Sequence, residues 1–235
     1  MSVTDLDARG NKRSPAATVG FSPPRPPATK GRRFPPDPLP IEDIVKLLGA
    51  CTPQRSGKIG ELSAARLRAL IIVLWRTGLR VSEALALEER DLNERERMVI
   101  VRRGKGGKRR LTLMDEWGWT QLDLWLRIRE ALPIGQVFCV LNGPTAGHAM
   151  KDSDVRRQLR EAGGRAGIRR HVHAHGLRHT HAVELWREGL DVYTIQNQLG
   201  HARLDVTASY LRGVAVTEVL KPIGERKAPL MPLPS

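Results

Sequence analysis

The segment from His175 to Tyr210 concentrates basic and nucleophilic side chains, in the order HGLRHTHAVELWREGLDVYTIQNQLGHARLDVTASY. A phenol that attacks phosphorus builds negative charge on the non-bridging oxygens of the phosphate. Guanidinium groups offset that charge through paired, charge-assisted hydrogen bonds, and Arg178 and, far upstream, Arg80 could supply them. These residue types could break and remake a phosphodiester bond without a metal or a cofactor.

The charge balance of the chain indicates the kind of partner such a site would meet. Lys and Arg total 39 against 25 Asp and Glu, which gives a formal net charge of +14. A strongly basic chain favours a polyanionic partner, and nucleic acid is the natural candidate. Cys51 and Cys139 stand outside any C-x-x-C pair, so neither a disulfide framework nor a thiolate metal site is indicated.

The sequence predicts neither a membrane-spanning segment nor an export signal. The longest purely apolar run, Ala69 to Trp75, is too short to cross a bilayer, and the first residues, MSVTDLDARGNKR, carry no apolar segment for export. We therefore expect a cytoplasmic protein with no membrane partner.

Residues 1–39 differ in composition from the rest of the chain. The first 40 residues hold nine of the 16 prolines and seven Lys or Arg against three Asp, with almost no apolar periodicity. This composition predicts a disordered basic arm. Such an arm could contact a DNA backbone or act as a tether, and the alternatives are a solubilising tail or a misassigned gene start. Residues 40–235 then form one domain, enough for a single core.

Apolar periodicity divides this domain into helices and a few strands. The pattern predicts strands at Met98–Arg102, Arg110–Leu113 and Val137–Leu141, the first two joined by the turn Gly104–Lys108. The sequence thus predicts an α+β fold, mainly α-helical, with a small three-stranded antiparallel sheet that carries a lysine hairpin. The predicted helices are 41–48, 63–77, 81–87, 119–130, 154–166, 175–188, 191–199 and 205–211.

Capping residues place the candidate groups at helix ends. Gly78 and Gly200 are the expected stops of two helices, and Asp191 and Asp205 are the expected N-caps of two others. Arg80 follows the first of these stops, at a junction from which a long side chain can reach into a cleft.

The chain resembles the tyrosine recombinase, or phage integrase, family from about residue 40 to its end. His201 stands nine residues before Tyr210, and Arg178 stands 23 before His201, as the family order requires. The matching pieces are T-G-L-R-V-S-E at 77–83 with Leu87 and Asp91, G-K-G at 104–106, H-x-L-R-H-T-x-A at 175–182, L-G-H at 199–201 and T-x-x-Y at 207–210.

The resemblance implies a role for each member of the candidate site. Tyr210 would attack the scissile phosphate and leave a 3′-phosphotyrosyl bond and a free 5′-hydroxyl. Arg80 and Arg178 would clamp the non-bridging oxygens. His175 would assist proton transfer or phosphate contact, and His201 would donate a hydrogen bond to the phosphate. The covalent bond stores the energy for resealing, so no cofactor and no metal are implied.

The lysine that protonates the departing 5′ oxygen is open between two residues. The family places its lysine between the turn glycines, which favours Lys105, but Lys108 lies in the same turn. Glu83 would orient an active-site basic group. His175 and His179 stand at i, i+4 and so invite a metal site, but no carboxylate or thiolate completes a ligand set.

Arginines of the helix predicted at 154–166 are either phosphate contacts or a solvated face. They are Arg156, Arg157, Arg160 and Arg165.

A typical family member carries a helical core-binding domain ahead of the catalytic domain, whereas we expect only the proline-rich arm ahead of residue 40 here. Phosphate contacts position a protein whereas base contacts specify sequence, so we expect weak site specificity unless an accessory DNA-binding protein contributes. The apolar stretch Val214–Leu220 resembles a segment that family members dock onto a neighbouring subunit, which implies a homotetramer on duplex DNA.

The resemblance thus predicts a site-specific recombinase or integrase, of the kind that mobile elements carry. The first alternative is a catalytically silent DNA-binding relic or regulator of the same fold. The second is a type IB topoisomerase, which shares the chemistry but needs no partner site.

Overall fold

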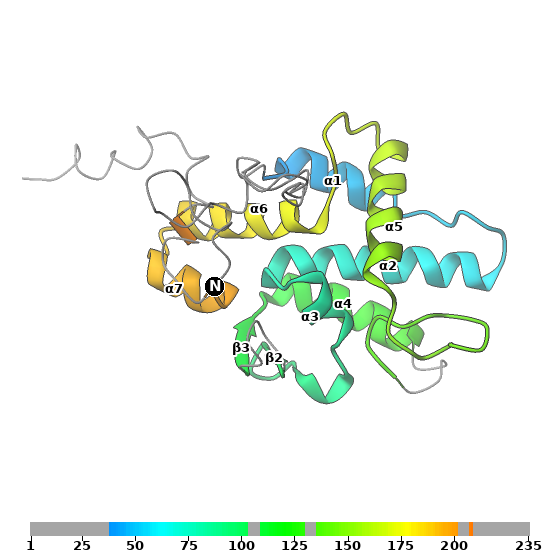
Figure 1. Ribbon diagram of the computed structural model, residues 1–235, viewed down its shortest axis with the longest axis horizontal. Helices are drawn as coiled ribbons and strands as arrows, with labels where there is room; N and C mark the ends of the chain where they lie inside the picture. Colours follow the sequence, from blue (N-terminus) through cyan, green and yellow to red (C-terminus); the bar gives the residue numbers. More distant parts are fainter. Residues whose placement is uncertain (1–37, 103–108, 130–134, 202–206, 209–235) are drawn as a thin grey trace, which may run out of the picture. The chain divides into compact units, whose positions relative to one another are not determined.

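The computed structural model describes residues 38–102, 109–129, 135–201 and 207–208 of this chain (Figure 1). This part of the chain is mainly helical and carries one small antiparallel sheet of order β1-β2-β3, which confirms the predicted fold class. The helices are α1 (Ile41–Gly49), α2 (Lys58–Thr77), α3 (Val81–Leu85), the 3-10 helix η3 (Glu89–Asp91), α4 (Glu116–Arg129), α5 (Asp152–Arg165), α6 (Ala174–Arg187) and α7 (Val192–Leu199), and the strands are β1 (Leu92–Asn93), β2 (Met98–Val101) and β3 (Arg110–Leu113).

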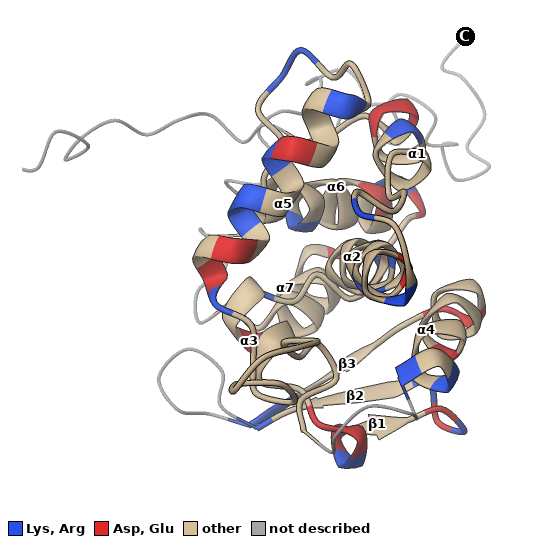
Figure 2. Ribbon diagram, turned by 90° about the vertical axis from the view of Figure 1, so that its right-hand side faces the viewer, with Lys and Arg blue, Asp and Glu red and all other residues tan. Residues whose placement is uncertain are grey.

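Helix α2 is the centre of the core. It packs against α4 and against α6 (Figures 1 and 2). Three of its side chains, Ile71, Ile72 and Leu74, have no exposed surface, although they point in different directions around the helix. A helical segment that is apolar all round is a buried one, and this part of α2 fixes the position of the loop that follows it.

The two long strands are paired across the predicted hairpin. Met98 lies opposite Leu113 and Val101 opposite Arg110, so the turn that was expected to carry Lys105 connects β2 to β3. Residues 103–108 themselves lie outside the described part of the chain.

The third predicted strand is wrong. Residues Val137–Leu141 form no strand of the sheet, and their only β-bridge among the described residues joins Cys139 to Ala149. Val137, Phe138 and Cys139 are fully buried, and this burial explains the apolar run that suggested a strand. The third strand is instead β1, which pairs with β2 over two residues and is too short to produce a periodic pattern.

The helices begin or end as predicted where the sequence has a residue with a strong capping preference. Gly78 and Gly200 both adopt left-handed backbone conformations, with φ of +64° and +67°, directly after α2 and α7. The Asp191 carboxylate accepts hydrogen bonds from the N–H groups of Tyr193 (2.8 Å) and Thr194 (3.0 Å) at the start of α7. Helix α2 begins at Lys58, ahead of the predicted Ser63. Its start has no side-chain cap, so no capping residue marked it in the sequence.

The last predicted helix falls mostly outside the described residues. Thr207 and Ala208 are helical, whereas Asp205 and Tyr210 lie in ranges that the structure does not describe. Of the described helices, none combines the length and the apolar character that a membrane crossing requires.

Replacing Gly78 with alanine should destabilise the protein. A Cβ at this position would lie 2.5 Å from Leu199 Cδ2 and 2.7 Å from His181 Cδ2, and a left-handed conformation with a Cβ costs about 1–2 kcal/mol by itself. We expect a loss of at least about 2 kcal/mol in the free energy of unfolding, measured by urea denaturation.

The matched control is Gly164→Ala. A Cβ at Gly164 meets no atom within 4 Å, and the residue sits inside α5 with helical geometry. Alanine is favoured over glycine there by about 0.5–1 kcal/mol. Equal effects of the two substitutions would contradict the packing described for Gly78.

Candidate active site

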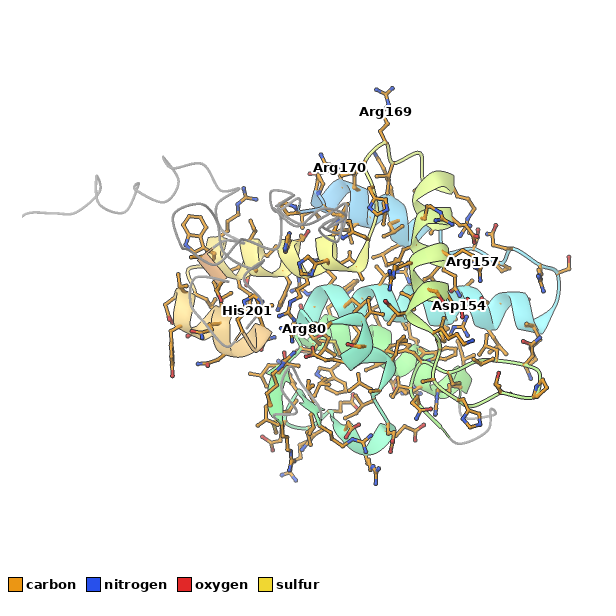
Figure 3. The ribbon with its side chains drawn as sticks, viewed as in Figure 1. Arg80, Asp154, Arg157, Arg169, Arg170 and His201 are labelled. Atoms are coloured by element: carbon orange, nitrogen blue, oxygen red, sulfur yellow. The ribbon has the colours of Figure 1, made fainter. Side chains whose placement is uncertain are left out.

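Arg80 caps the start of α3 and reaches across to the end of α7. Its backbone N–H donates to Glu83 Oε2 (2.9 Å), and its Nη1 donates to Glu83 Oε1 (2.7 Å). Its Nη2 donates to the carbonyl oxygen of Gly200 at 3.5 Å. The side chain is 28% exposed, so a ligand can reach it from solvent. Figure 3 shows Arg80 beside His201.

Arg178 comes from α6 and joins the same two helix ends from inside the protein. It is 1% exposed. Its Nη1 donates to the carbonyl of Gly78, and its Nη2 donates to the carbonyl of Leu199 (2.7 Å). Cations are favoured at helix C-termini, where carbonyl groups lack partners within the helix. The ends of α2 and α7 thus bring Arg80 and Arg178, 98 positions apart in the sequence, to one junction.

His201 follows the left-handed Gly200 and is buried at the same junction. Its Nδ1 lies 2.9 Å from Thr207 Oγ1, and its carbonyl accepts a hydrogen bond from Gln196 Nε2 (2.9 Å). Loss of contact with water, together with the positive charges of Arg178 and Arg80, lowers the pKa of His201 to about 3. The imidazole is therefore neutral at neutral pH, with one nitrogen a donor and the other an acceptor.

His175 lies in the first turn of α6, near both arginines. Its side chain reaches the surface, yet partial loss of hydration and the charges of Arg178 and His173 lower its pKa to about 4. Its ring packs against that of His179, with ring centroids 4.4 Å apart. A neutral imidazole at this edge can accept or pass on a proton.

Glu83 is the buried carboxylate of the site. Burial alone would raise its pKa, but the charges of Arg110 and Arg80 and the hydrogen bonds from Arg80 outweigh that effect and hold the pKa below its usual range. The structure thus places Glu83 against Arg80, as the sequence led us to expect.

Sequence reasoning missed Arg110 as a member of the site. Its Nη2 donates to Glu83 Oε2 (2.8 Å) and its Nη1 to the carbonyl of Gln198 (3.0 Å). The sequence does contain an indication of this role, because Arg110 and Thr112 alternate with leucines and so share one face of β3. Thr112 is buried, whereas Leu111 and Leu113 are exposed, so the polar residues of this strand face inward and need partners.

Gln198 is a second residue that sequence reasoning missed. Its side-chain amide pairs with the main chain of the edge strand β3, accepting from Leu113 N–H (3.0 Å) and donating to Leu113 C=O (2.8 Å). The amide thus takes the place of a neighbouring strand residue. No local pattern announces this role, because it depends on how α7 lies against β3.

Two predicted site residues, Lys105 and Tyr210, lie outside the described ranges. The same holds for Lys108, so the alternative between the two lysines stays open.

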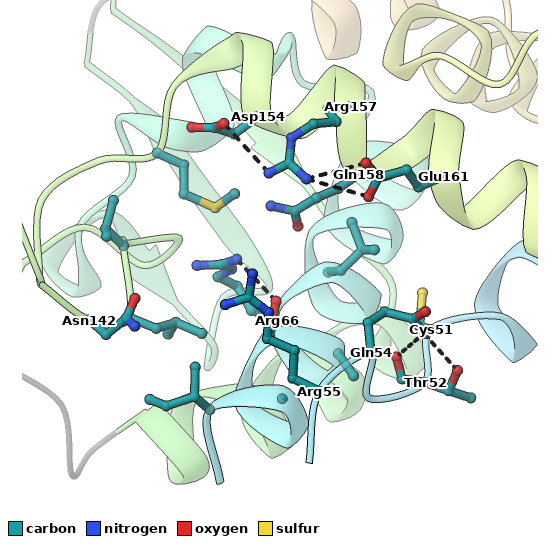
Figure 4. Close-up of a pocket in the computed structure, with 18 of the residues that line it drawn as sticks. Cys51, Thr52, Gln54, Arg55, Arg66, Asn142, Asp154, Arg157, Gln158 and Glu161 are labelled. Carbon is teal, nitrogen blue, oxygen red and sulfur yellow. Dashed lines mark hydrogen bonds and ion pairs between the residues drawn. The ribbon is translucent and has the colours of Figure 1, made fainter. Parts of the chain in front are cut away.

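The arginines of α5 are exposed, and three of the four contact nearby acceptors. Arg156 pairs with Asp152, and Arg157 pairs with Asp154 (3.7 Å) and Glu161 (3.3 Å) (Figures 2 and 4). Arg165 donates to the carbonyl of Ala50 (3.2 Å). Their charge is thus partly offset, as on a solvated helix face.

A hollow of about 360 Å³ lies between α2 and α5 (Figure 4). Its lining includes Arg66, whose Nη1 donates to the carbonyl of Cys139 (2.7 Å). None of the predicted site residues lines it. The candidate active site is therefore the junction of Arg80, Arg178, His175 and His201, which is not part of this hollow.

Comparisons with known proteins identify relatives of this chain. The sequence model of the phage integrase family matches residues 39–215. The chain is 36% identical over 188 residues to tyrosine recombinase XerD of Mycobacterium tuberculosis (strain H37Rv), an alignment that covers 78% of this chain and 58% of XerD. It is 35% identical over 148 residues to tyrosine recombinase XerA of Pyrococcus furiosus, covering 63% of this chain and 50% of XerA. The chain therefore spans between 50% and 58% of the length of these relatives.

Solved structures show the same fold. The XerA recombinase crystal structure aligns with a TM-score of 0.68 and 28% identity, over 88% of this chain and 68% of that one. The XerH site-specific recombinase bound to difH substrate, in a pre-cleavage complex, aligns with a TM-score of 0.62 and 28% identity, over 81% and 54% of the two chains.

The depressed histidine pKa values make the stability of the fold sensitive to acid. Burial and neighbouring positive charge lower the pKa of His181 to about 3, as for His201, against about 6.5 in an unfolded chain. Between these values the unfolded state binds more protons, so the free energy of unfolding must fall as pH drops below about 6.5. We expect thermal melts to show a progressive loss of stability from pH 7 to pH 4.

His181→Gln isolates one of these groups. Removal of one such imidazole should reduce the slope of unfolding free energy against pH by up to about 1.4 kcal/mol per pH unit. His148→Gln, which removes an exposed imidazole, is the control and should leave the slope as in the wild type. An unchanged slope in His181→Gln would contradict the assignment of a buried, neutral His181.

Proposed function

Because the chain belongs to the phage integrase family, we propose that it cuts and rejoins duplex DNA at specific sites through a 3′-phosphotyrosyl intermediate formed by Tyr210. The observation that carries the proposal is the junction at which Arg80, Arg178 and His201 meet, since two cations and an imidazole that can stabilise one phosphate come there from three separate segments. No cofactor is needed, because the phosphotyrosyl bond keeps the energy for resealing.

The two arginines have different parts in this proposal. Arg80 is partly exposed and is the guanidinium that an incoming phosphate meets first. Arg178 is buried, and its fork is fixed in direction by the carbonyls of Gly78 and Leu199. A buried charge is poorly screened, so Arg178 raises the positive potential at the phosphate and stabilises the negative charge that develops there.

The histidines act in their neutral forms. When the Thr207 hydroxyl donates to Nδ1 of His201, the imidazole proton sits on Nε2, from which it can be donated to a non-bridging oxygen. His175 assists removal of the phenol proton of Tyr210 or contacts the phosphate. A phenol has a pKa near 10, so it attacks only with a base nearby and with cations that stabilise the phenolate. Lys105, with Lys108 as the alternative, protonates the departing 5′ oxygen.

The proposal extends to the other parts of the assembly. XerD of M. tuberculosis extends well beyond the region that this chain matches, so we propose that a further domain or an accessory DNA-binding protein contributes base contacts. Residues 1–39, a basic arm, would contact the DNA backbone, and 40–235 would be the catalytic domain. The active assembly would be a homotetramer on duplex DNA.

Tyr210→Phe should abolish covalent attachment to DNA. The assay uses a pool of nicked duplexes of varied sequence, from which the short strand beyond the cut diffuses away and leaves protein joined to DNA on a denaturing gel. Removal of the phenol oxygen removes the nucleophile, so no adduct should form. Arg80→Met should slow adduct formation by about 10²–10³, as loss of one transition-state donor does.

Tyr193→Phe is the matched control, because Tyr193 is the chain's other tyrosine and is 65% exposed on α7. This variant should form adduct at the wild-type rate. An adduct that persists in Tyr210→Phe refutes the assignment. Salt-dependent DNA binding without adduct on any duplex would favour a silent DNA-binding protein, and plasmid relaxation by the monomer would favour a topoisomerase.

A further inference from the structure

Arg110 is a largely buried cation that the proposed chemistry leaves without a role. Its side chain is 14% exposed. It begins β3, immediately after the hairpin turn, and it contacts the site through Glu83 and the end of α7. A buried guanidinium is costly unless it is paired, so its position needs an explanation.

The Glu83 carboxylate is shared between two arginines. Oε1 accepts from Arg80 Nη1 (2.7 Å), whereas Oε2 accepts from both the Arg80 backbone N–H (2.9 Å) and Arg110 Nη2 (2.8 Å). The carboxylate is 3% exposed, so water screens these charges poorly. The three side chains carry two positive charges and one negative charge.

This balance decides how much charge Arg80 presents to a ligand. With Arg110 in place, the cluster keeps a net charge of +1, and Arg80 is its exposed member. Without Arg110, Glu83 would neutralise Arg80 alone, and the pair would attract a phosphate far more weakly. The second contact of Arg110, with the Gln198 carbonyl, holds the guanidinium in the plane that Glu83 requires.

Close packing explains why arginine occupies this position. A Cβ on Gly200 would lie 2.3 Å from both Cδ and Nε of Arg110, so the arginine stem fills the space beside the left-handed glycine. A lysine would present a single ammonium group in place of the two Nη groups that bond Glu83 and the Gln198 carbonyl separately.

We propose that Arg110 is a positioning residue that shares Glu83 with Arg80 and thereby keeps the charge of Arg80 available to a phosphate. The inference rests on the proposed function, because it takes Arg80 as the group that binds the scissile phosphate. It adds a residue that works through Arg80 without contacting the reacting atoms.

Inorganic phosphate tests the inference without DNA or a nucleophile. Its affinity is measured by NMR titration of the wild type and of Arg110→Met, with Arg80→Met to locate the ion. We expect Arg110→Met to weaken phosphate binding about tenfold or more, because the net charge of the cluster falls from +1 to zero. Arg110→Lys, which restores charge but not the fork, should recover part of the affinity and guards against a variant that fails to fold.

The double variant Arg110→Met/Glu83→Gln tests whether Arg110 acts by offsetting the charge of Glu83 or only by holding its neighbours in place. If Arg110 acts by offsetting Glu83, the double variant keeps the net charge of +1 and should bind phosphate more tightly than Arg110→Met alone. A double variant that binds phosphate no better than Arg110→Met would overturn the inference. Arg109→Met removes one exposed charge from the adjacent residue and should leave phosphate affinity unchanged.

The outcomes distinguish this inference from the proposed function. Equal phosphate affinity in wild type and Arg110→Met, or binding that survives Arg80→Met, overturns the role of Arg110. Absence of a DNA adduct in the wild type overturns the proposed cleavage, and the phosphate titration remains readable in that case.

Discussion

The candidate site depends on the meeting of two helix C-termini. Helices α2 and α7 both end at a left-handed glycine, and their last carbonyls have no partner within the helix. Arg178 donates hydrogen bonds to the carbonyls of Gly78 and Leu199, and Arg80 donates one to the carbonyl of Gly200. The hydrogen bonds that satisfy the carbonyls at the helix ends therefore also hold two guanidinium groups at one place. The fold and the site depend on the same bonds.

Positive charge at this junction also sets the state of the histidines. The charge of Arg178 opposes protonation of both His175 and His201, and burial acts in the same direction. The imidazoles thus stay neutral, which is the form that can donate at one nitrogen and accept at the other. The only buried carboxylate found in the described part of the junction, Glu83, is committed to arginine partners.

Much of this arrangement could be predicted from the sequence because its signals are local. Gly78, Gly200 and Asp191 mark helix ends by their own backbone and side-chain preferences, and these ends place Arg80 and His201. The apolar run Val137–Leu141 led to a wrong strand prediction, because a buried irregular segment shows the same run of apolar residues as a buried strand. Arg110 and Gln198 were missed because their partners, Glu83 and Leu113, lie 27 and 85 residues away.

Gln198 links helix α7 to strand β3. Its amide occupies both main-chain groups of Leu113 on the free edge of the sheet, three positions before His201. Arg110, at the other end of β3, bonds the carbonyl of the same residue, Gln198. Strand β3 is therefore attached to α7 at both of its ends. Because the turn between β2 and β3 carries the candidate lysines, a shift of that hairpin would also move the end of α7, and with it His201 and the carbonyls that hold both arginines.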